Sequence, residues 1–103
     1  MRSLKHPNPD QIELTDVMYA LSDPARLEIV RRLSASKDMT CGELNPDRPK
    51  SSMSHHFKIL REAGLIETRV EGKEHYNNLR KDALNRRFPG LLKSLLRVIP
   101  AEG

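Results

Sequence analysis

The spacing of apolar residues in this chain changes at Gly64. Before it, Met53, Phe57 and Leu60 recur every three or four residues, which predicts a helix over residues 51–63. After it, residues 65–70 (LIETRV) alternate apolar and polar side chains, and residues 74–79 (EHYNNL) follow beyond a turn that contains Gly72. Because glycine commonly stands just past the end of a helix, the segment predicts one helix joined directly to a β-hairpin.

Two further helices are predicted before this pair. Residues 8–11 (NPDQ) have the composition of a helix start, and apolar residues follow at helical spacing over 14–21. A second start is predicted at Asp23, a good N-cap, with Pro24 where its missing N–H costs nothing. Residues 34–40 predict a connector with a short strand near 39. Residues 41–45 (CGELN) leave room for about one helical turn before two prolines.

The C-terminal part is predicted to be helical. Beyond Asp82 the apolar residues recur every three or four positions, and Pro89-Gly90 interrupts them, which predicts two short helices or one sharp bend. The predicted fold class is therefore mainly α with a small β-hairpin, in the order α-α-α-α-β-β-α. A short helix, a turn and a polar-faced helix followed by a hairpin form a winged helix-turn-helix, whose second helix enters the major groove of DNA. We expect residues 1–9 to be a flexible tail and residues 10–99 to be one domain for DNA binding and dimerisation.

The charge of the chain is unevenly distributed. Residues 1–47 hold 6 lysines and arginines against 8 acidic residues, whereas residues 48–103 hold 12 against 6. A basic half indicates a surface that meets a polyanion, and a merely solvated surface is the alternative interpretation.

The chain contains one cysteine, Cys41, so a disulfide within it is impossible and a reducing compartment is expected. The first ten residues lack the apolar stretch of a secretory signal. The most apolar segment, residues 91–99 (LLKSLLRVI), is far shorter than the roughly 20 residues of a membrane span. We therefore expect a cytoplasmic protein without a membrane partner.

The adjacent residues His55 and His56 fall on different sides of the predicted 51–63 helix. At about 100° per residue, the apolar residues named above form the buried side, and His56 lies at its flank as a half-buried structural residue. The opposite side carries small hydroxyls, an imidazole and an ammonium group, on Ser51, Ser54, His55 and Lys58. Side chains about 100° apart do not readily chelate one ion, and no nucleophile signature surrounds them. Neither a metal site nor an enzyme is predicted.

Small polar side chains allow a helix to approach base edges, and lysine reaches guanine or phosphate. We therefore predict that base sequence is recognised by Ser51, Ser52, Ser54, His55 and Lys58. Phosphate contacts are predicted for Lys50, Arg69 and Lys73, with Arg48 as a further candidate. A charged turn is common on any protein surface, which is the alternative interpretation of Lys73 taken alone.

Three motifs resemble the ArsR family of winged helix-turn-helix regulators. LSDPARLEI at 21–29 resembles the family's second-helix pattern, and SHHFKILREAGL at 54–65 resembles its recognition helix, with Phe57 in place of the usual leucine. Gly72-Lys73 resembles the wing turn. The resemblance covers about residues 14–80 and implies a homodimer that binds an operator with twofold symmetry and usually represses transcription. Many family members release DNA when they bind a metal ion.

Two departures from the family pattern concern that metal. Metal-sensing members carry a CVCDL box, whereas TCGEL at 40–44 puts Thr40 and Gly42 at the two ligand positions, with Cys41 between them. Other members place Asp and His ligands on the last helix, and residues 81–100 contain no histidine. We therefore expect no metal and no cofactor. Cys41 is either a small, partly buried residue at a helix start or a thiol sensor whose pKa the helix N-terminus lowers.

Dimerisation is predicted for apolar residues of the first and last helices, although ordinary packing within one chain explains part of this set: Leu14, Val17, Met18, Leu21, Leu91, Leu92, Leu95 and Ile99. The predicted function is a sequence-specific DNA-binding transcriptional regulator, a dimeric repressor that binds an inverted-repeat operator through the 51–63 helix and the 69–75 wing. Its partners are then double-stranded operator DNA and a second copy. Two alternatives are a redox- or ligand-responsive variant that uses Cys41 and a winged-helix module that binds proteins instead of DNA.

Overall fold

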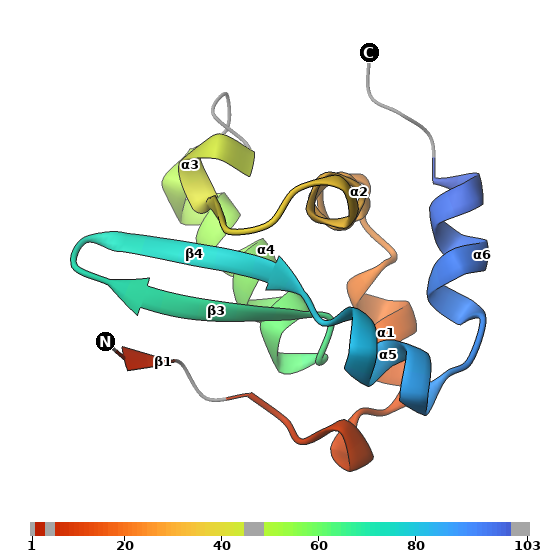
Figure 1. Cartoon of the computed structure of the whole chain (residues 1–103). Coiled ribbons are helices and arrows are strands. Elements are labelled where there is room, and N and C mark those ends of the chain that lie inside the picture. Colours follow the sequence, from red (N-terminus) through yellow and green to blue (C-terminus); the bar gives the residue numbers. More distant parts are fainter. Residues whose placement is uncertain (1, 4–5, 45–48, 100–103) are drawn as a thin grey trace.

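The fold was analysed in a computed structural model that describes residues 2–3, 6–44 and 49–99 (Figure 1). The described helices pack around the base of one antiparallel sheet, whose β-hairpin extends beyond them. In chain order the elements are β1 (Arg2–Ser3), a 3-10 turn η1 (Pro9–Gln11), α1 (Leu14–Ala20), α2 (Pro24–Ala35), β2 (Met39–Thr40), α3 (Cys41–Leu44), α4 (Lys50–Glu62), β3 (Ile66–Glu71), β4 (Glu74–Leu79), α5 (Lys81–Arg87) and α6 (Leu91–Val98). A mainly helical fold with a small hairpin is confirmed.

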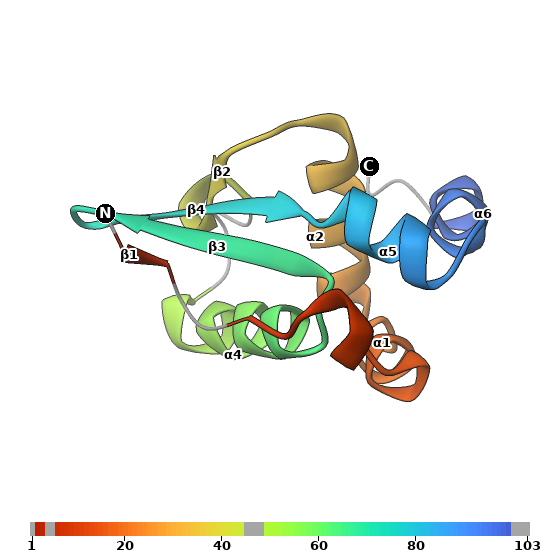
Figure 2. The same ribbon diagram turned by 60° about the horizontal axis from the view of Figure 1, so that its bottom comes forward.

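The sheet has four strands in the order β1-β3-β4-β2. The β3–β4 hairpin supplies its two long strands, with Ile66 opposite Leu79 at the base and Glu71 opposite Glu74 next to the turn. Figure 2 shows the hairpin projecting from the helices as a wing, with its turn far from α6. The short strand predicted near Met39 is present as β2, which pairs with β4.

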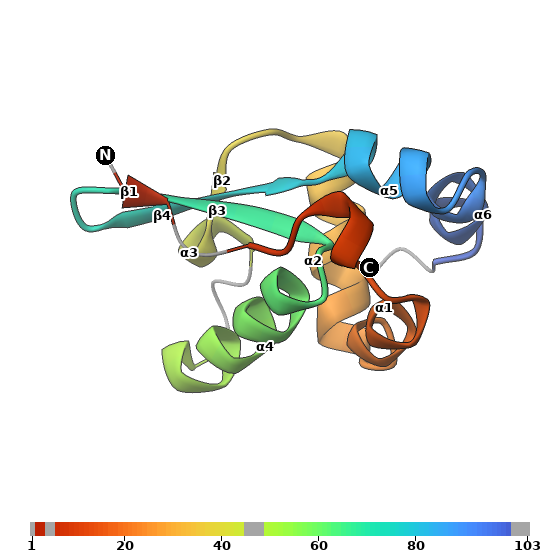
Figure 3. The same ribbon diagram turned by 90° about the horizontal axis from the view of Figure 1, so that it is seen from below.

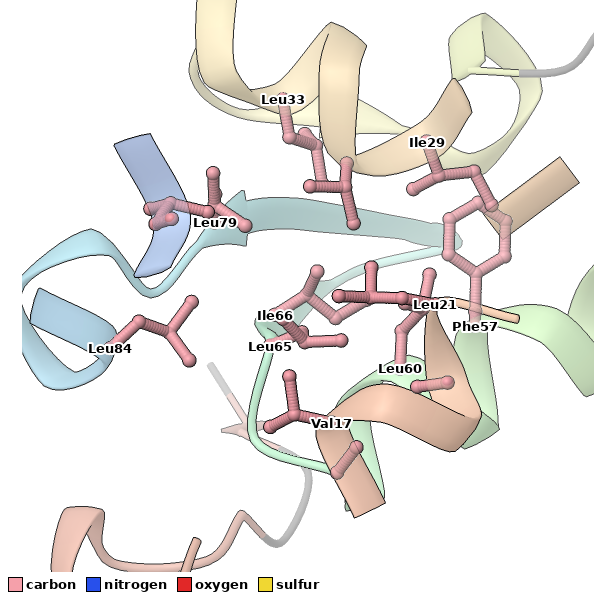
Figure 4. Close-up of a cluster of buried hydrophobic side chains, with 14 of the residues drawn as sticks. Val17, Leu21, Ile29, Leu33, Phe57, Leu60, Leu65, Ile66, Leu79 and Leu84 are labelled. Atoms are coloured by element: carbon pink, nitrogen blue, oxygen red, sulfur yellow. The ribbon is translucent and has the colours of Figure 1, made fainter. Parts of the chain in front are cut away.

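One apolar cluster joins α1, α2, α4, α5 and the base of the hairpin. Figure 4 shows the side chains converging from these elements: Val17, Leu21, Ile29, Leu33, Phe57, Leu60, Leu65, Ile66, Leu79 and Leu84. Every one of them is at most 8% exposed. Because α4 and the base of the hairpin share this core, the base of the hairpin is held in a fixed relation to α4.

The junction between α4 and β3 is a tight helix terminus. Gly64 has φ +90°, the Leu65 N–H donates to the Leu60 carbonyl at 3.0 Å, and the Gly64 N–H donates to the Arg61 carbonyl at 3.1 Å. These two bonds define a Schellman motif, which satisfies carbonyls at the end of the helix and needs a left-handed residue. The chain therefore passes from helix to strand without an intervening loop, as the change in apolar spacing predicts.

The described residues 2–3 and 6–7 make contacts that a loose tail over residues 1–9 would not make. β1 pairs with β3, the Thr68 N–H donates to His6 Nε2 at 2.9 Å, and Arg80 donates to the Pro7 carbonyl at 2.8 Å. An uncovered edge of β3 would present unpaired backbone groups, and the N-terminal segment satisfies them.

Two predicted helices are divided. The first is interrupted between η1 and α1, where Ile12 is extended and its side chain is 1% exposed in the core. The last is split into α5 and α6 by Pro89-Gly90, one of the two outcomes the sequence allows. The observed order therefore adds β1, β2 and a further helix to the predicted α-α-α-α-β-β-α series. Within the described ranges no helix is long and apolar enough to cross a bilayer.

Candidate nucleic-acid interface

The outward side of α4 carries the residues predicted to recognise bases. Ser51, Ser52, Ser54, His55 and Lys58 are all exposed, while Met53, Phe57 and Leu60 on the opposite side are at most 4% exposed. Lys50 begins the helix, and Arg48 lies outside the described residues. The Ser52 hydroxyl donates to the Pro49 carbonyl at 3.1 Å, which leaves its oxygen lone pairs available as acceptors. The helix thus presents an exposed polar ridge that combines three small serine side chains with an imidazole and a lysine.

His56 is half-buried beside this ridge, and one of its partners is Arg26. An Arg26 guanidinium nitrogen lies 3.1 Å from His56 Nδ1, and other guanidinium nitrogens donate to the Ala20 carbonyl at 2.6 Å and the Tyr19 carbonyl at 3.4 Å. Because a guanidinium only donates, His56 Nδ1 accepts in this contact. Arg26 is 6% exposed, so a buried cation joins α4 to the corner between α1 and α2.

Sequence reasoning did not single out Arg26. It stands in the 21–29 motif between Ala25 and Leu27, and an arginine flanked by apolar residues in a helix can be a buried, bonded charge. The N-cap next to it was predicted correctly, because Asp23 Oδ1 accepts from the Ala25 and Arg26 backbone N–H groups at 2.8 and 3.3 Å.

The wing carries less free positive charge than expected. Lys73 is exposed in the turn, but Glu71 and Glu74 stand on either side of it. Arg69 lies along β3 opposite Tyr76, not at the tip, and its guanidinium pairs with Glu71 and with Asp38 Oδ1 at 3.2 Å. A guanidinium held by two carboxylates is a poor candidate for a phosphate contact.

The start of α4 and the turn of the wing lie at the same end of the molecule. Figure 2 and Figure 3 show both at the left, with α6 at the right. Half of the basic residues of 48–103 lie instead at 80–97, in α5, α6 and the residues beside them: Arg80, Lys81, Arg86, Arg87, Lys93 and Arg97. The uneven charge of the sequence therefore does not correspond to one cationic face.

The segment that aligns with the family's metal box forms a helix cap. The Thr40 N–H donates to Glu43 Oε1 at 2.9 Å, and the Glu43 N–H donates to Thr40 Oγ1 at 3.2 Å. This reciprocal pair is a capping box, which the spacing T-x-x-E could have revealed in the sequence. Among the residues that the structure describes, no three potential ligands gather around a metal site. The donor set at this position does not fit a metal.

Cys41 is partly buried against a polar network. The side-chain amide of Asn77, which is fully buried, donates to Cys41 Sγ at 3.4 Å and to the Met39 carbonyl at 3.2 Å. Burial raises the pKa of the Cys41 thiol, and the Asn77 hydrogen bond offsets only part of the effect. These surroundings favour the protonated thiol, which is opposite to what a reactive sensor needs.

The residues predicted for dimerisation fall into two groups. Val17, Leu21 and Leu92 are at most 8% exposed inside the core of the single chain. Leu14 and Met18 are 48% and 41% exposed on α1, and the remaining members are half-buried on α6 or at its end: Leu91, Leu95 and Ile99. Ordinary packing within one chain thus accounts for part of the predicted set.

Similarity to known proteins points to one class of protein. Residues 21–69 match a family described as a helix-turn-helix domain. The uncharacterised HTH-type transcriptional regulator YceK of Bacillus subtilis is 43% identical over 89 residues, which cover 84% of this chain and 88% of that protein. The arsenical resistance operon repressor of Staphylococcus xylosus is 35% identical over 71% of each chain. A crystal structure of an ArsR family transcriptional regulator superposes with a TM-score of 0.66 at 28% identity, covering 79% of this chain and 90% of that one. These likenesses, together with the exposed polar side of α4 and the hairpin beside it, establish that the chain belongs to the ArsR family of winged helix-turn-helix transcriptional regulators.

Proposed function

We propose that this protein is a dimeric transcriptional repressor that binds an inverted-repeat operator, with α4 of each subunit in a major groove. The observation that carries the proposal is the exposed ridge of small polar side chains on α4, backed by a rigid apolar core. A helix with such a ridge fits the major groove, and its rigid support fixes the groove contacts relative to the wing. A protein that binds operator DNA works in the compartment that holds this DNA, so the proposed location is the cytoplasm.

The exposed residues of α4 and the wing turn would have two different roles in binding DNA. Ser51, Ser52, Ser54, His55 and Lys58 would contact base edges, because hydroxyls and imidazole both donate and accept and lysine reaches guanine. Lys50 and Lys73 would contact phosphates and supply the salt-dependent part of the affinity. We leave Arg69 out of this set, since its guanidinium is already paired with Asp38 and Glu71.

A second copy of the chain fits the α1–α6 side. Leu14, Met18 and Tyr19 are exposed on α1, and Val98 is 74% exposed on α6. These two helices also carry opposite charges: Glu13 and Asp16 stand at the start of α1, whereas Lys93 and Arg97 stand on α6. Pairing α1 of one subunit with α6 of the other would bury the apolar residues and match the charges.

Repression is the activity named for several similar proteins, including the arsenical resistance operon repressor and the transcriptional repressor SdpR. We propose the same outcome here, without arsenical or other metal sensing, because the aligned segment forms a helix cap. A repressor of this kind acts by occupying its operator.

Selection of bound DNA from a random duplex pool tests the proposal directly. We expect a palindromic consensus whose half-sites lie about one helical turn, roughly 34 Å, apart. Failure to enrich any sequence, together with a shift assay that is insensitive to salt, would contradict DNA recognition and favour the protein-interaction alternative.

Three substitutions separate the proposed roles on the selected operator. His55→Ala should change the preferred bases, whereas Lys73→Ala should weaken all duplexes alike and lower the slope of log affinity against log salt by about one unit. Arg86→Ala is the control, since it removes one exposed cation from α5, away from the wing turn (Figure 2) and outside the proposed α1–α6 contact. Equal losses for Lys73→Ala and Arg86→Ala would contradict a wing contact.

A further inference from the structure

Asp38, in the connector after α2, has an unusual backbone conformation. Its φ is +51°, and among the described residues no other non-glycine residue has a positive φ. Aspartate tolerates the left-handed region better than most residues, but the conformation persists only where surrounding contacts fix it.

Those contacts come from both strands of the wing. The Asp38 N–H donates to Asn78 Oδ1 at 2.9 Å, and the Asn78 side-chain amide donates back to Asp38 Oδ1 at 2.7 Å. Arg69 donates to the same Asp38 oxygen at 3.2 Å. Asn78 belongs to β4 and Arg69 to β3, so one carboxylate bonds to both strands.

Further contacts of Arg69 link Asp38 to residues nearer the tip of the wing. The Arg69 guanidinium also pairs with Glu71, the last residue of β3, and lies 5.3 Å from the centre of the Tyr76 ring on β4. The connection therefore runs from the end of α2 to within two residues of Lys73.

We propose that Asp38 is a positioning residue that holds the wing at a fixed angle to the helix-turn-helix body, so that Lys73 and α4 reach DNA together. This rests on the proposed DNA-binding function. Isolated exposed ion pairs contribute little, but Asp38 combines a reciprocal backbone and side-chain bond with a left-handed residue, and this combination restricts direction as well as distance.

The hydrogen bonds also affect the charge of Asp38. The Asn78 hydrogen bond, and after it the Arg69 hydrogen bond, hold the pKa of the Asp38 carboxyl below its usual value. The carboxylate is therefore charged at every pH where DNA binding would be measured.

The first test needs no DNA. Asp38→Gly keeps the left-handed backbone without strain and removes the side chain, so the fold should survive. We expect amide hydrogen exchange at residues 71–74 to become about tenfold faster, with α4 unchanged. Asp38→Asn keeps an acceptor for Asn78 and should therefore retain most of the protection from hydrogen exchange that Asp38→Gly loses. Unchanged exchange at 71–74 in Asp38→Gly would overturn the proposal, whether or not the protein binds DNA.

The second test measures coupling to Lys73 on the selected operator. Lys73→Ala should weaken binding in the wild-type background but have little further effect in Asp38→Gly, which should itself bind about tenfold more weakly. Glu67→Gln, at an exposed position of β3, is the control for the charge change in Asp38→Gly because each removes one negative charge. If Lys73→Ala costs the same factor in both backgrounds, Asp38 does not position the wing. If Lys73→Ala costs nothing in the wild type, the proposed wing contact fails instead, and the exchange experiment alone decides the role of Asp38.

Discussion

The position of Cys41 at a helix start and its burial have opposite effects on the pKa of its thiol. A thiol at a helix start is stabilised as thiolate by the helix dipole, but α3 is only four residues long. Burial dominates and raises the pKa of the thiol above its usual value. The side chain is therefore mostly protonated at neutral pH.

We predict that Cys41 reacts slowly with iodoacetamide in the folded protein. Because only the thiolate reacts, the rate should rise with pH and reach half its maximum at a higher pH than in the unfolded chain. Mass spectrometry of the alkylated fraction across pH measures this, with the urea-unfolded chain as the fast-reacting control. Rapid alkylation at pH 7 would instead support the thiol-sensor alternative.

The adjacent residues His55 and His56 show what helix periodicity can predict and what it cannot. Helix geometry alone distinguishes the exposed His55 from the half-buried His56. The Arg26 partner of His56 lies 30 residues away and was not predictable from local periodicity. The pairing of Arg69 with Asp38 was missed for the same reason, since the two are 31 residues apart.

Gly64, at the end of α4, is required for two separate reasons: its backbone angle and the lack of space for a side chain. At Gly64 a Cβ atom would lie 2.6 Å from Ile12 Cγ1, in addition to the left-handed φ. At Gly72 φ is +59° but nothing lies within 4 Å of the added Cβ, and at Gly42 the space is open without a positive φ. These three glycines separate steric overlap from backbone strain.

We predict a graded loss of stability for Gly→Ala at the three positions. Gly42→Ala should be close to neutral, and Gly72→Ala should cost about 1 kcal/mol from backbone strain alone. Gly64→Ala should cost about 2–5 kcal/mol, because overpacking against Ile12 adds to the strain. Urea denaturation gives the three free energies of unfolding. A Gly64→Ala cost equal to that of Gly72→Ala would mean that Ile12 moves aside freely.

Elements with their own periodicity or caps were predictable, and elements that depend on distant partners were not. α2, α4 and the hairpin follow from apolar spacing, Asp23 and Gly64. β1 has no local signal, because it forms only where β3 offers an unpaired edge. The break between η1 and α1 arises because Ile12 packs against Gly64, 52 residues away in the chain.

The distribution of exposed apolar and charged groups over the surface bears on assembly. Exposed large hydrophobic residues gather on α1 and α6, far from the wing turn (Figure 3). Val17, Leu21 and Leu92 were predicted for the same contact but lie in the core of the single chain. Apolar periodicity shows which side of a helix is buried, but it does not show whether the same chain or a second copy buries it.

We predict that Met18→Glu yields a folded monomer. Met18 is 41% exposed, so a charge there should leave the core intact but oppose burial against a second copy. Light scattering across concentration should show dimer association at least tenfold weaker than in the wild type, and operator affinity should fall with it. Asn85→Glu, at an exposed polar position on α5 outside the proposed α1–α6 contact, is the control and should remain dimeric. A wild-type chain that is monomeric at high concentration would contradict the dimer.

The division of α4 into an inward and an outward side has an evolutionary consequence. Substitutions at Ser51, Ser54, His55 or Lys58 leave the contacts of Met53, Phe57 and Leu60 untouched, because the two sets share no packing surface. If these outward residues read the operator as proposed, operator preference and thermal stability are separate traits on one helix. A duplicated gene could acquire a new target through few outward changes while the inherited scaffold stays intact, and the same separation makes α4 a convenient site for redesigning specificity.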